Sequence, residues 1–275
     1  MSAFVRGARV VIARRFDAND TPVLIHRHGV TVFAGVPLMF DQILNNKDLS
    51  PGMLSSLRLT LSAAAPLSPS TQLGFYQRFG IPLIQFYGLT EAYVLTVQPI
   101  KYKEVTNTVG SAILGAELKI VDPPNNPSRE LGVGEVGELV ARAPWVMKGY
   151  SDPDDTRRAF HNGWLLTGDL MVMDDKGLLY FRGVRKRMIK YKGYPIFPRD
   201  LEIMLMKHPA VKEVYVTGEQ AEDPSVGQLP VAYVVLHDEY RSRVSDKDLI
   251  DFVNSRVAFY KKLRKVYFVD RLPTN

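Results

Sequence analysis

The chain has 275 residues, and its 46% hydrophobic and 23% charged content is ordinary for a folded chain with a real core. It contains no cysteine, which excludes a disulfide framework and thiolate chemistry. No apolar run is long enough to cross a membrane and no signal peptide is recognisable, so we expect a cytoplasmic protein. The net charge of +6 could suit nucleic acid or small anionic ligands. Because the basic residues concentrate at 182–192 and 261–265, without a nucleic-acid-binding signature, we expect no nucleic-acid partner.

Residues 1–105 are expected to alternate strands and helices, which favours a parallel sheet. Runs of apolar and β-branched residues predict the strands, and apolar residues at helical spacing predict the helices. Pro69 suits the first turn of a helix that opens at Ser68. The strands are predicted at 10–13, 31–36, 57–61 and 81–84, and the helices over a segment ending about His28, over 38–46 and over 68–79.

Residues 106–181 change in character, because short β-type runs alternate there with Gly, Pro and Asn. These runs, at 118–121, 138–141, 164–167 and 178–181, predict a small β-barrel-like subdomain or folded sheet. Residues 132–137 formally match the G-x-G-x-x-G dinucleotide fingerprint. That fingerprint requires a following helix, and here another strand follows, so we interpret these glycines as turn residues.

Residues 182–192 are the expected boundary between the large domain, 1–181, and a small α+β domain, 193–275. In the small domain we expect a helix from Pro198 to Lys207, strands at 211–217, 231–236 and 266–269, and a helix from about 246 to Tyr260. Ser245 and Asp248 resemble a capping box at the start of that last helix. The fold class is therefore α/β, with a partial parallel sheet, a β-rich subdomain and a small α+β domain.

The residues Q-F-Y-G-L-T-E at 85–91 carry the clearest chemistry. They are expected in the exit loop of the strand at 81–84, and ligands bind at that edge of an α/β sheet. Gly88 lets the backbone approach a ligand, and the Thr90 hydroxyl can donate to a phosphate oxygen. Glu91 is an oxygen ligand that suits Mg²⁺, which prefers carboxylates plus phosphates. A plain turn with a packed tyrosine also fits these residues alone.

Y-G-L-T-E at 87–91 resembles the core motif of the adenylate-forming enzymes, which include acyl-CoA synthetases, aryl-CoA ligases, luciferases and peptide-synthetase adenylation domains. Three further segments resemble that family in the expected order. They are S-A-A-A-P-L at 62–67, G-W-L-L-T-G-D-L at 163–170 and I-K-Y-K-G-Y at 189–194. The resemblance implies that a carboxylate is activated by ATP as an acyl-adenylate, which is then transferred to CoA.

The resemblance also implies roles for single residues. Thr90 contacts the α-phosphate, Glu91 holds Mg²⁺ and Tyr87 stacks on adenine. Asp169 accepts from the ribose hydroxyls. Val184 stands where the family usually has arginine on the ribose, and Arg185 or Arg182 could substitute. The full nucleotide-binding set is Ala64, Ala65, Pro66, Phe86, Tyr87, Gly88, Thr90, Asp169 and Arg185.

By the same resemblance, Lys186 occupies the hinge position. Lys190, Gly193 and Tyr194 are expected to bind CoA, and Lys190 is expected to be catalytic as well. The acyl pocket is formed by Val36, Ser62, Phe86, Val109 and Gly110. Ala63, Ala64 and Phe86 are bulkier than the glycines of many relatives. We therefore expect a small or medium apolar carboxylic acid rather than a long fatty acid.

Two parts of the family pattern are not found in this sequence: a phosphate loop before Val10 and a catalytic lysine beyond Leu272 and Pro273. We therefore expect an acid–CoA ligase fragment with very weak pyrophosphate exchange, and either an N-terminal partner chain or self-association. An adenylation domain that loads a carrier protein and a non-catalytic fragment that binds nucleotide or a partner chain remain as alternatives.

Overall fold

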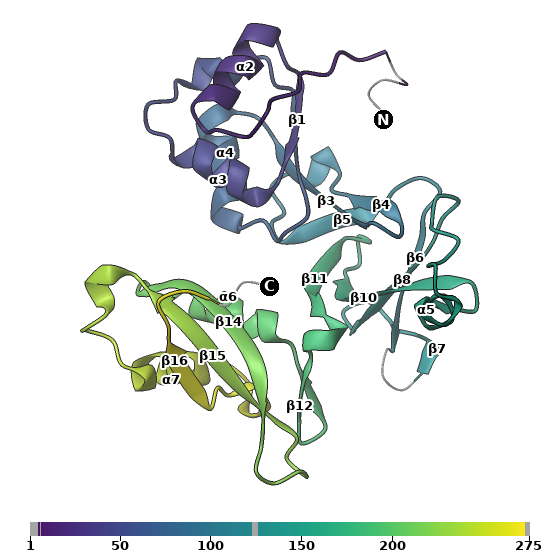
Figure 1. Ribbon diagram of the computed structural model, residues 1–275, viewed down its shortest axis with the longest axis vertical. Helices are drawn as coiled ribbons and strands as arrows, with labels where there is room; N and C mark the ends of the chain where they lie inside the picture. The colour runs from purple at the N-terminus through teal and green to yellow at the C-terminus, as the bar shows by residue number, and fades with distance from the viewer. Residues whose placement is uncertain (1–4, 6, 123–125, 273–275) are drawn as a thin grey trace. The chain divides into compact units, whose positions relative to one another are not determined.

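The computed structural model describes residues 5, 7–122 and 126–272 (Figure 1). Pro273, in the expected terminal motif, lies outside the described residues. Contacts divide the chain into two compact units, and each is described by itself. The first unit holds residues 1–167 and 172–181, and the second holds residues 168–171 and 182–275.

The first unit alternates helices and strands from Asp20 to Leu89 and consists mainly of strands after that. Its helices are α2 (Asp20–His28), α3 (Pro37–Asn45), α4 (Pro69–Phe79) and α5 (Pro153–Ala159), with short 3-10 turns at Pro51–Leu54 and Ile100–Tyr102. Its strands are β1 (Val32–Gly35), β2 (Leu59–Ser62), β3 (Leu83–Leu89), β4 (Tyr93–Val97), β5 (Thr108–Ala112), β6 (Glu117–Asp122), β7 (Asn126–Glu130), β8 (Val136–Arg142), β9 (Phe160–His161), β10 (Trp164–Met173) and β11 (Leu179–Val184). Parts of β10 and β11 fall in the second unit.

One sheet runs in the order β1-β2-β3-β4-β5-β11-β10-β8-β6-β7, with β9 paired to β10. β1, β2 and β3 are parallel, and β3, β4, β5 and β11 pair antiparallel. The mixed α/β fold class is thus confirmed. The β-rich residues continue this open sheet and, in the part of the chain that the structure describes, form no closed barrel.

The predicted strand at 10–13 is wrong. Residues 8–13 have no regular structure, and Ile12 is 84% exposed. A β-branched run favours a strand only where it packs on a sheet and pairs with a neighbour. No described strand pairs with this segment.

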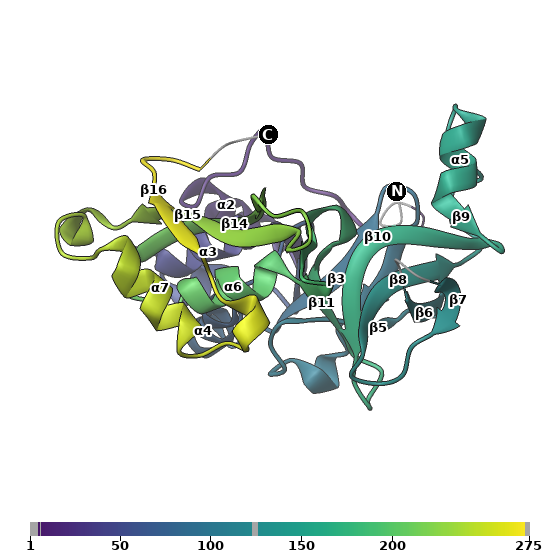
Figure 2. The same cartoon turned by 90° about the horizontal axis from the view of Figure 1, so that it is seen from below.

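Aromatic side chains form the centre of the α/β part. The Phe40 and Phe75 rings are fully buried and meet edge to face at 5.5 Å. Ser68 caps α4 by accepting from the Thr71 backbone N–H at 3.0 Å, as its position before Pro69 suggests. Figure 2 shows α2, α3 and α4 from a second side.

A strand, β8 (Val136–Arg142), begins within residues 132–137 and no helix follows directly, so rejection of the dinucleotide fingerprint is confirmed. Gly137 lies in this strand rather than in the expected turn. Gly137 is required by close strand contact, because a Cβ there would lie 2.3 Å from the Val121 carbonyl oxygen. No helix of the described residues is long and apolar enough to cross a membrane.

The second unit packs two helices against a small sheet. Its elements are the 3-10 turn Arg185–Arg187, β12 (Ile189–Tyr191), β13 (Tyr194–Ile196), α6 (Pro198–Leu205), β14 (Val211–Gln220), β15 (Gln228–Leu236), the 3-10 turn Asp238–Tyr240, α7 (Asp246–Asn254), the 3-10 turn Phe259–Lys261 and β16 (Lys265–Phe268). β14 pairs antiparallel with β15, which pairs parallel with β16. Buried residues of α6, α7 and these strands form one core.

The capping box is confirmed, since Ser245 and Asp248 exchange side-chain and backbone hydrogen bonds. The helix that it opens ends at Asn254, before the expected Tyr260. Asn254 explains the stop: its side-chain amide donates to the Leu263 carbonyl at 3.1 Å and accepts from the Leu263 N–H at 2.8 Å. These bonds tie the end of α7 to the returning chain, which a purely local pattern does not reveal.

Candidate functional site

The motif at 85–91 is a hairpin rather than an exit loop. β3 continues to Leu89, the chain turns over residues 90–92, and β4 begins at Tyr93. The Ala92 N–H closes the turn on the Leu89 carbonyl at 3.1 Å. Thr90 is exposed and Glu91 is half-buried, so both polar residues stand at the hairpin tip.

Gly88 is required by the close approach of β4, and its expected part in letting the backbone approach a ligand stays a prediction. A Cβ on Gly88 would lie 1.7 Å from the Tyr93 carbonyl oxygen. The register shifts between Tyr87 and Gly88, which is typical of a bulge, and Tyr93 has a positive φ of 51°. The glycine therefore shapes the hairpin that presents Thr90 and Glu91.

A network of buried amides fixes the start of the motif. Gln85 donates from Nε2 to the Thr108 carbonyl at 2.9 Å, and its N–H donates to the Gln98 side-chain oxygen at 3.1 Å. Gln98 also accepts from Gln72 at 3.0 Å and donates to the Tyr102 and Val105 carbonyls. Because buried polar groups that are paired hold one arrangement, this network fixes β3 against α4 and β5.

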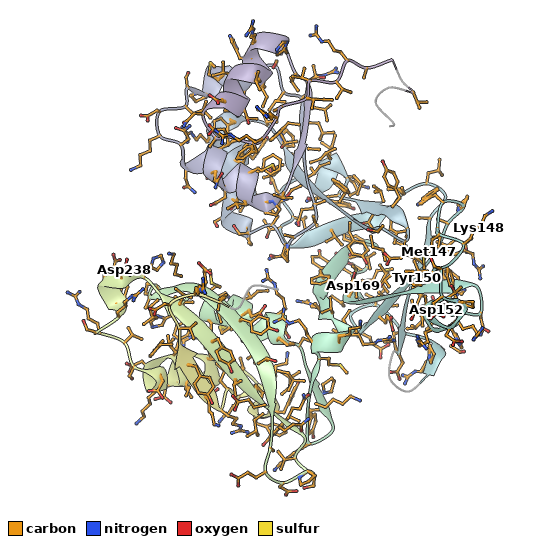
Figure 3. The ribbon with its side chains drawn as sticks, in the orientation of Figure 1. Met147, Lys148, Tyr150, Asp152, Asp169 and Asp238 are labelled. Atoms are coloured by element: carbon orange, nitrogen blue, oxygen red, sulfur yellow. The ribbon has the colours of Figure 1, made fainter. Side chains whose placement is uncertain are left out.

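Glu91 has a partner that sequence reasoning missed. The Tyr150 phenol donates to Glu91 Oε1 at 2.7 Å, and the Met147 N–H donates to the Glu91 carbonyl at 2.7 Å (Figure 3). The hydrogen bond to Glu91, followed by burial, raises the pKa of Tyr150 above its ordinary value. The phenol is therefore a neutral donor to the carboxylate at neutral pH.

One local sequence signal, a helix start, lies directly after Tyr150. Asp152 and Pro153 stand at the N-cap and first turn of α5, a helix that our sequence analysis also missed. The signal predicts a helix start after Tyr150, but 59 residues separate Tyr150 from Glu91. No local pattern could have paired them.

Three of the expected acyl-pocket residues, Val36, Ser62 and Phe86, form a row across β1, β2 and β3. Gly35, Ser62 and Gln85 are register partners on β1, β2 and β3, so Val36 and Phe86 follow at the same edge. Val109 and Gly110 lie on β5. The structure thus places Val36, Ser62 and Phe86 at adjacent positions and the other two residues two strands from β3, and the role of all five as an acyl pocket stays a prediction.

Two of these positions are tightly constrained. A Cβ at Gly110 would lie 2.1 Å from the Val97 carbonyl carbon, and Gly110 has a φ of +90°. Ser62 is 1% exposed, and its hydroxyl has no hydrogen-bond partner among the described residues. Such an orphaned hydroxyl is unusual in a native protein.

The other expected nucleotide residues of the first unit lie beside this row. Ala64, Ala65 and Pro66 are exposed, and Ala64 has a positive φ of 69°. The Leu67 N–H that follows donates to Gln85 Oε1 at 3.3 Å, which ties this loop to β3. Tyr87 is half-buried and packs on the cluster that includes Ala92 and Leu95.

The remaining expected site residues belong to the second unit. Asp169 lies on β10, and Arg185 and Lys186 are exposed on the 3-10 turn that follows β11. Lys190 is exposed on β12. Because these residues belong to a different unit from the β3–β4 hairpin, their approach to the hairpin stays a prediction.

The tight turn of the hairpin β12–β13 explains why a glycine stands at position 193. Lys192 and Gly193 have φ values of 47° and 80°, and consecutive positive φ values are typical of a two-residue hairpin turn. Among the described residues, no atom beyond its two chain neighbours lies within 4 Å of a Cβ built on Gly193. Tyr194 stacks on Tyr260 at 4.9 Å and meets Phe259 edge to face, which gives an exposed aromatic cluster beside Lys190 and Lys192.

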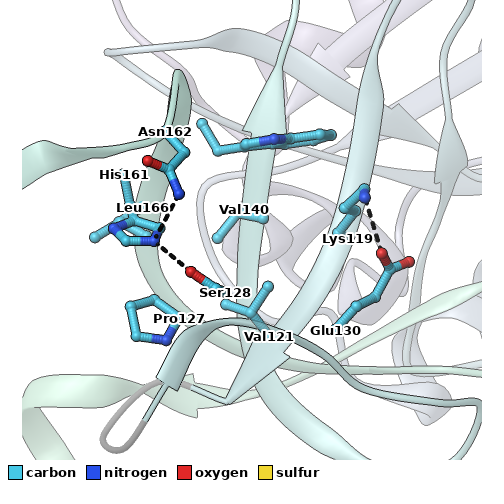
Figure 4. A pocket seen from close by; sticks show the side chains of 10 residues that line it. Lys119, Val121, Pro127, Ser128, Glu130, Val140, His161, Asn162 and Leu166 are labelled. Carbon is cyan, nitrogen blue, oxygen red and sulfur yellow. Dashed lines mark hydrogen bonds and ion pairs between the residues drawn. The ribbon is translucent and has the colours of Figure 1, made fainter.

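A separate hollow of about 140 Å³ lies over β6, β8 and β10 (Figure 4). Its polar side chains pair with one another: Ser128 and His161 are 2.8 Å apart, and Lys119 and Glu130 form an ion pair at 2.8 Å. None of the expected site residues lines it. The hollow is therefore distinct from the candidate site.

Within the described residues, no cluster of three or more His, Cys, Asp or Glu side chains could hold a metal ion by itself. Glu91 alone offers a carboxylate at the hairpin tip. This donor set fits Mg²⁺, which is usually bound through one or two carboxylates together with substrate phosphates and water. It does not fit a metal held by protein ligands only.

The chain belongs to the AMP-binding enzyme family. The family model described as AMP-binding enzyme matches residues 1–151, and the model of its C-terminal domain matches residues 200–275. The recognition made from the four motifs is thereby confirmed.

Among curated relatives, 4-coumarate–CoA ligase 1 of Oryza sativa subsp. japonica is 36% identical and covers 97% of this chain and 48% of its own length. 4-coumarate–CoA ligase 1 of Glycine max is 35% identical, covering 97% of this chain and 92% of its own. The chain thus spans about half the length of the Oryza sativa relatives and most of the length of the Glycine max relative.

Solved structures agree with the family. ATP-bound MatB from Rhodopseudomonas palustris matches with a TM-score of 0.90 at 28% identity, over 99% of this chain and 53% of its own. MenE, an o-succinylbenzoate–CoA synthetase from Bacillus subtilis, was solved in complex with ATP and magnesium ion. It matches with a TM-score of 0.85 at 31% identity, over 98% of this chain and 54% of its own.

Proposed function

We propose that this chain is part of an ATP-dependent acid–CoA ligase, in which a carboxylate is activated as an acyl-adenylate and then transferred to the thiol of CoA. The observation that carries the proposal is the β3–β4 hairpin, which presents Thr90 and Glu91 beside the row formed by Val36, Ser62 and Phe86. The family membership and the solved complexes of relatives with ATP support it.

The nucleotide would be held chiefly by this hairpin. The exposed Thr90 hydroxyl can donate to the α-phosphate, and the half-buried Tyr87 ring offers a face for adenine. The loop at 64–66 would cover the base from the other side. We assign Asp169 to the ribose hydroxyls and Arg185 to the nucleotide, in agreement with the family motif at 163–170.

Mg²⁺ would be held by Glu91 together with substrate phosphates, and when bound it offsets the negative charge that opposes attack of a carboxylate on ATP. The residues of this chain perform the other tasks. Thr90 orients the α-phosphate, and Tyr150 holds one Glu91 oxygen. A fixed donor set of this kind costs no rearrangement when charge develops on the phosphate.

The acid would lie along the row of Val36, Ser62, Phe86, Val109 and Gly110. Phe86 is half-buried and Gly110 packs directly on the β4 backbone, so this edge offers little depth. We therefore infer a small or medium apolar carboxylic acid.

The second unit would supply the residues that bind CoA, the acceptor of the acyl group. Lys190, Gly193 and Tyr194 belong to the exposed hairpin β12–β13, which carries positive charge and aromatic surface suited to the nucleotide portion of CoA. We place the hinge at residues 182–192, with Lys186 as its pivot, and the small domain at 193–275. Lys190 would approach the reacting groups during thioester formation.

A further chain segment or a second copy would complete the sheet. β1 is the first strand of the sheet order and pairs in the described residues with β2 alone. Val32 on this edge is 49% exposed, and Leu38 on α3 is 63% exposed. An uncovered edge with apolar neighbours favours association with another strand.

Binding of a stable acyl-adenylate mimic, in which a sulfamate replaces the phosphate, tests the proposed function. Calorimetric titration should show that mimics with short or aromatic acyl groups bind this chain more tightly than AMP does. Absence of binding for AMP and for every mimic would overturn the proposal. Tighter binding of mimics with long acyl chains would overturn the proposed class of acid only.

A further inference from the structure

The segment from Trp145 to Tyr150, which we call the strap, contacts the β3–β4 hairpin at three points. Trp145 donates from Nε1 to the Val94 carbonyl at 3.1 Å. The Met147 N–H donates to the Glu91 carbonyl, and the Tyr150 phenol donates to Glu91 Oε1, each at 2.7 Å. Figure 3 shows Met147, Lys148 and Tyr150 close together in the first unit. The strap thus holds both the main chain and the side chain of Glu91.

The position of Tyr150 is fixed from the other side by α5. Its N–H donates to the Thr156 hydroxyl at 2.8 Å, and that hydroxyl lies 3.1 Å from the Asp152 carbonyl. Gly149 allows this approach, since a Cβ there would lie 2.7 Å from Thr156 Oγ1. Asp152 in turn caps α5 through the Asp154 N–H at 2.7 Å. The backbone of Tyr150 is therefore fixed by α5.

A phenol hydroxyl has one hydrogen to donate, so it engages one oxygen of the carboxylate. It occupies Oε1 of Glu91, and the structure gives Oε2 no hydrogen bond among the described residues. Groups that orient a ligating carboxylate commonly tune metal affinity, although they do not touch the metal. A neutral donor does this without adding charge to the site.

We propose that Tyr150 is a positioning residue for Glu91, which holds the carboxylate at the hairpin tip so that its second oxygen can bind the Mg²⁺ of a metal–nucleotide complex. The inference rests on the proposed function, because it requires Glu91 to be the metal ligand. It extends that function to a residue outside the four recognised motifs.

The test compares Tyr150→Phe with the wild-type chain, using Mn²⁺ as a paramagnetic probe in the presence of ATP. Electron paramagnetic resonance measures the affinity for Mn²⁺, and calorimetry measures the affinity for ATP without metal. We expect Tyr150→Phe to weaken Mn²⁺ binding about 10-fold and to leave metal-free ATP binding unchanged.

Trp145→Phe is the matched control, because it removes another strap hydrogen bond and keeps the contact between Tyr150 and Glu91. We expect wild-type Mn²⁺ affinity for this variant. If Mn²⁺ affinity falls equally in both variants, the strap is purely structural and the inference is overturned. The same holds if Tyr150→Phe loses metal-free ATP affinity as much as it loses Mn²⁺ affinity. Unchanged Mn²⁺ affinity in Tyr150→Phe would also overturn it while the proposed function stands. A wild-type chain that binds ATP without any metal dependence would remove Glu91 as the ligand and overturn both.

Discussion

Arg187 and Glu202 form an ion pair in the second unit, with 2.6 Å between Arg187 Nη2 and Glu202 Oε1. Glu202 is 5% exposed and also accepts from the Val216 N–H at 3.1 Å. Arg187 donates to the Val216 carbonyl at 2.9 Å and lies over the Tyr215 ring. The pair therefore fastens Arg187 to β14, directly after Lys186, the residue that we propose as the pivot.

Removal of Glu202 should loosen β14 and β15. A buried charge that loses its partner destabilises strongly, but Arg187 is partly exposed, so we expect Glu202→Ala to cost about 2 kcal/mol. Hydrogen exchange in peptides from β14 and β15 should accelerate by roughly 30-fold. The exposed Glu239→Ala is the control and should exchange like the wild type. Equal rates in both variants would contradict a role for the ion pair.

The amide network should stabilise the first unit. Gln98→Leu removes the hydrogen bond of the Gln85 N–H and one bond each from the Gln72 amide and the Tyr102 and Val105 carbonyls, and we expect a loss of about 3 kcal/mol. Urea unfolding followed by tryptophan fluorescence reports this unit, because Trp145 and Trp164 both lie in it. Gln77→Leu, on the exposed side of α4, should change the midpoint little. A similar midpoint for the two variants would refute the network's contribution.

Phe86 should limit the length of the acid. In Phe86→Ala, the affinity for an octanoyl-adenylate mimic relative to a butyryl-adenylate mimic should rise about 10-fold or more, because a side chain of this size leaves room for additional methylenes. The ratio within one variant cancels any general loss of nucleotide binding. A ratio equal to that of the wild type would place the end of the pocket elsewhere.

The capping box should respond to acid. Hydrogen bonds from the Ser245 N–H and then from its hydroxyl lower the pKa of Asp248 below its usual 3.8. A carboxyl with a lowered folded pKa stabilises the fold above its unfolded pKa, and that stabilisation is lost as pH falls through the folded pKa. In Ser245→Ala, the titration midpoint of Asp248 measured by NMR should rise part of the way to 3.8. An unchanged midpoint would contradict the role of the hydroxyl.

Local sequence patterns predicted much of the fold, because features such as helix caps are determined by residues close together in the sequence. The cap at Ser68 and Pro69 and the capping box of α7 were read directly from sequence. The strand at 10–13 was wrong and the β3–β4 hairpin was missed, because pairing depends on neighbours that a local run does not specify.

For the candidate site, the resemblance supplied the residues and the structure supplied their arrangement. Phe86 and Val36 share an edge because β1, β2 and β3 are parallel and in register. Tyr150 was not predicted, because its contact with Glu91 depends on the course of the strap across many intervening strands. Gly88 was assigned to ligand access, and the structure adds that the hairpin itself requires a glycine there.

Binding of ATP with Mg²⁺ to the wild-type chain and to Glu91→Gln tests the central claim most directly, with the exposed Glu104→Gln as control. By calorimetry, Mg²⁺ should strengthen ATP binding to the wild type and to Glu104→Gln by about 10-fold or more, and Glu91→Gln should lose this gain while it keeps its metal-free affinity. Equal strengthening by Mg²⁺ in Glu91→Gln, or no ATP binding to the wild-type chain, would contradict a metal–nucleotide site at the β3–β4 hairpin.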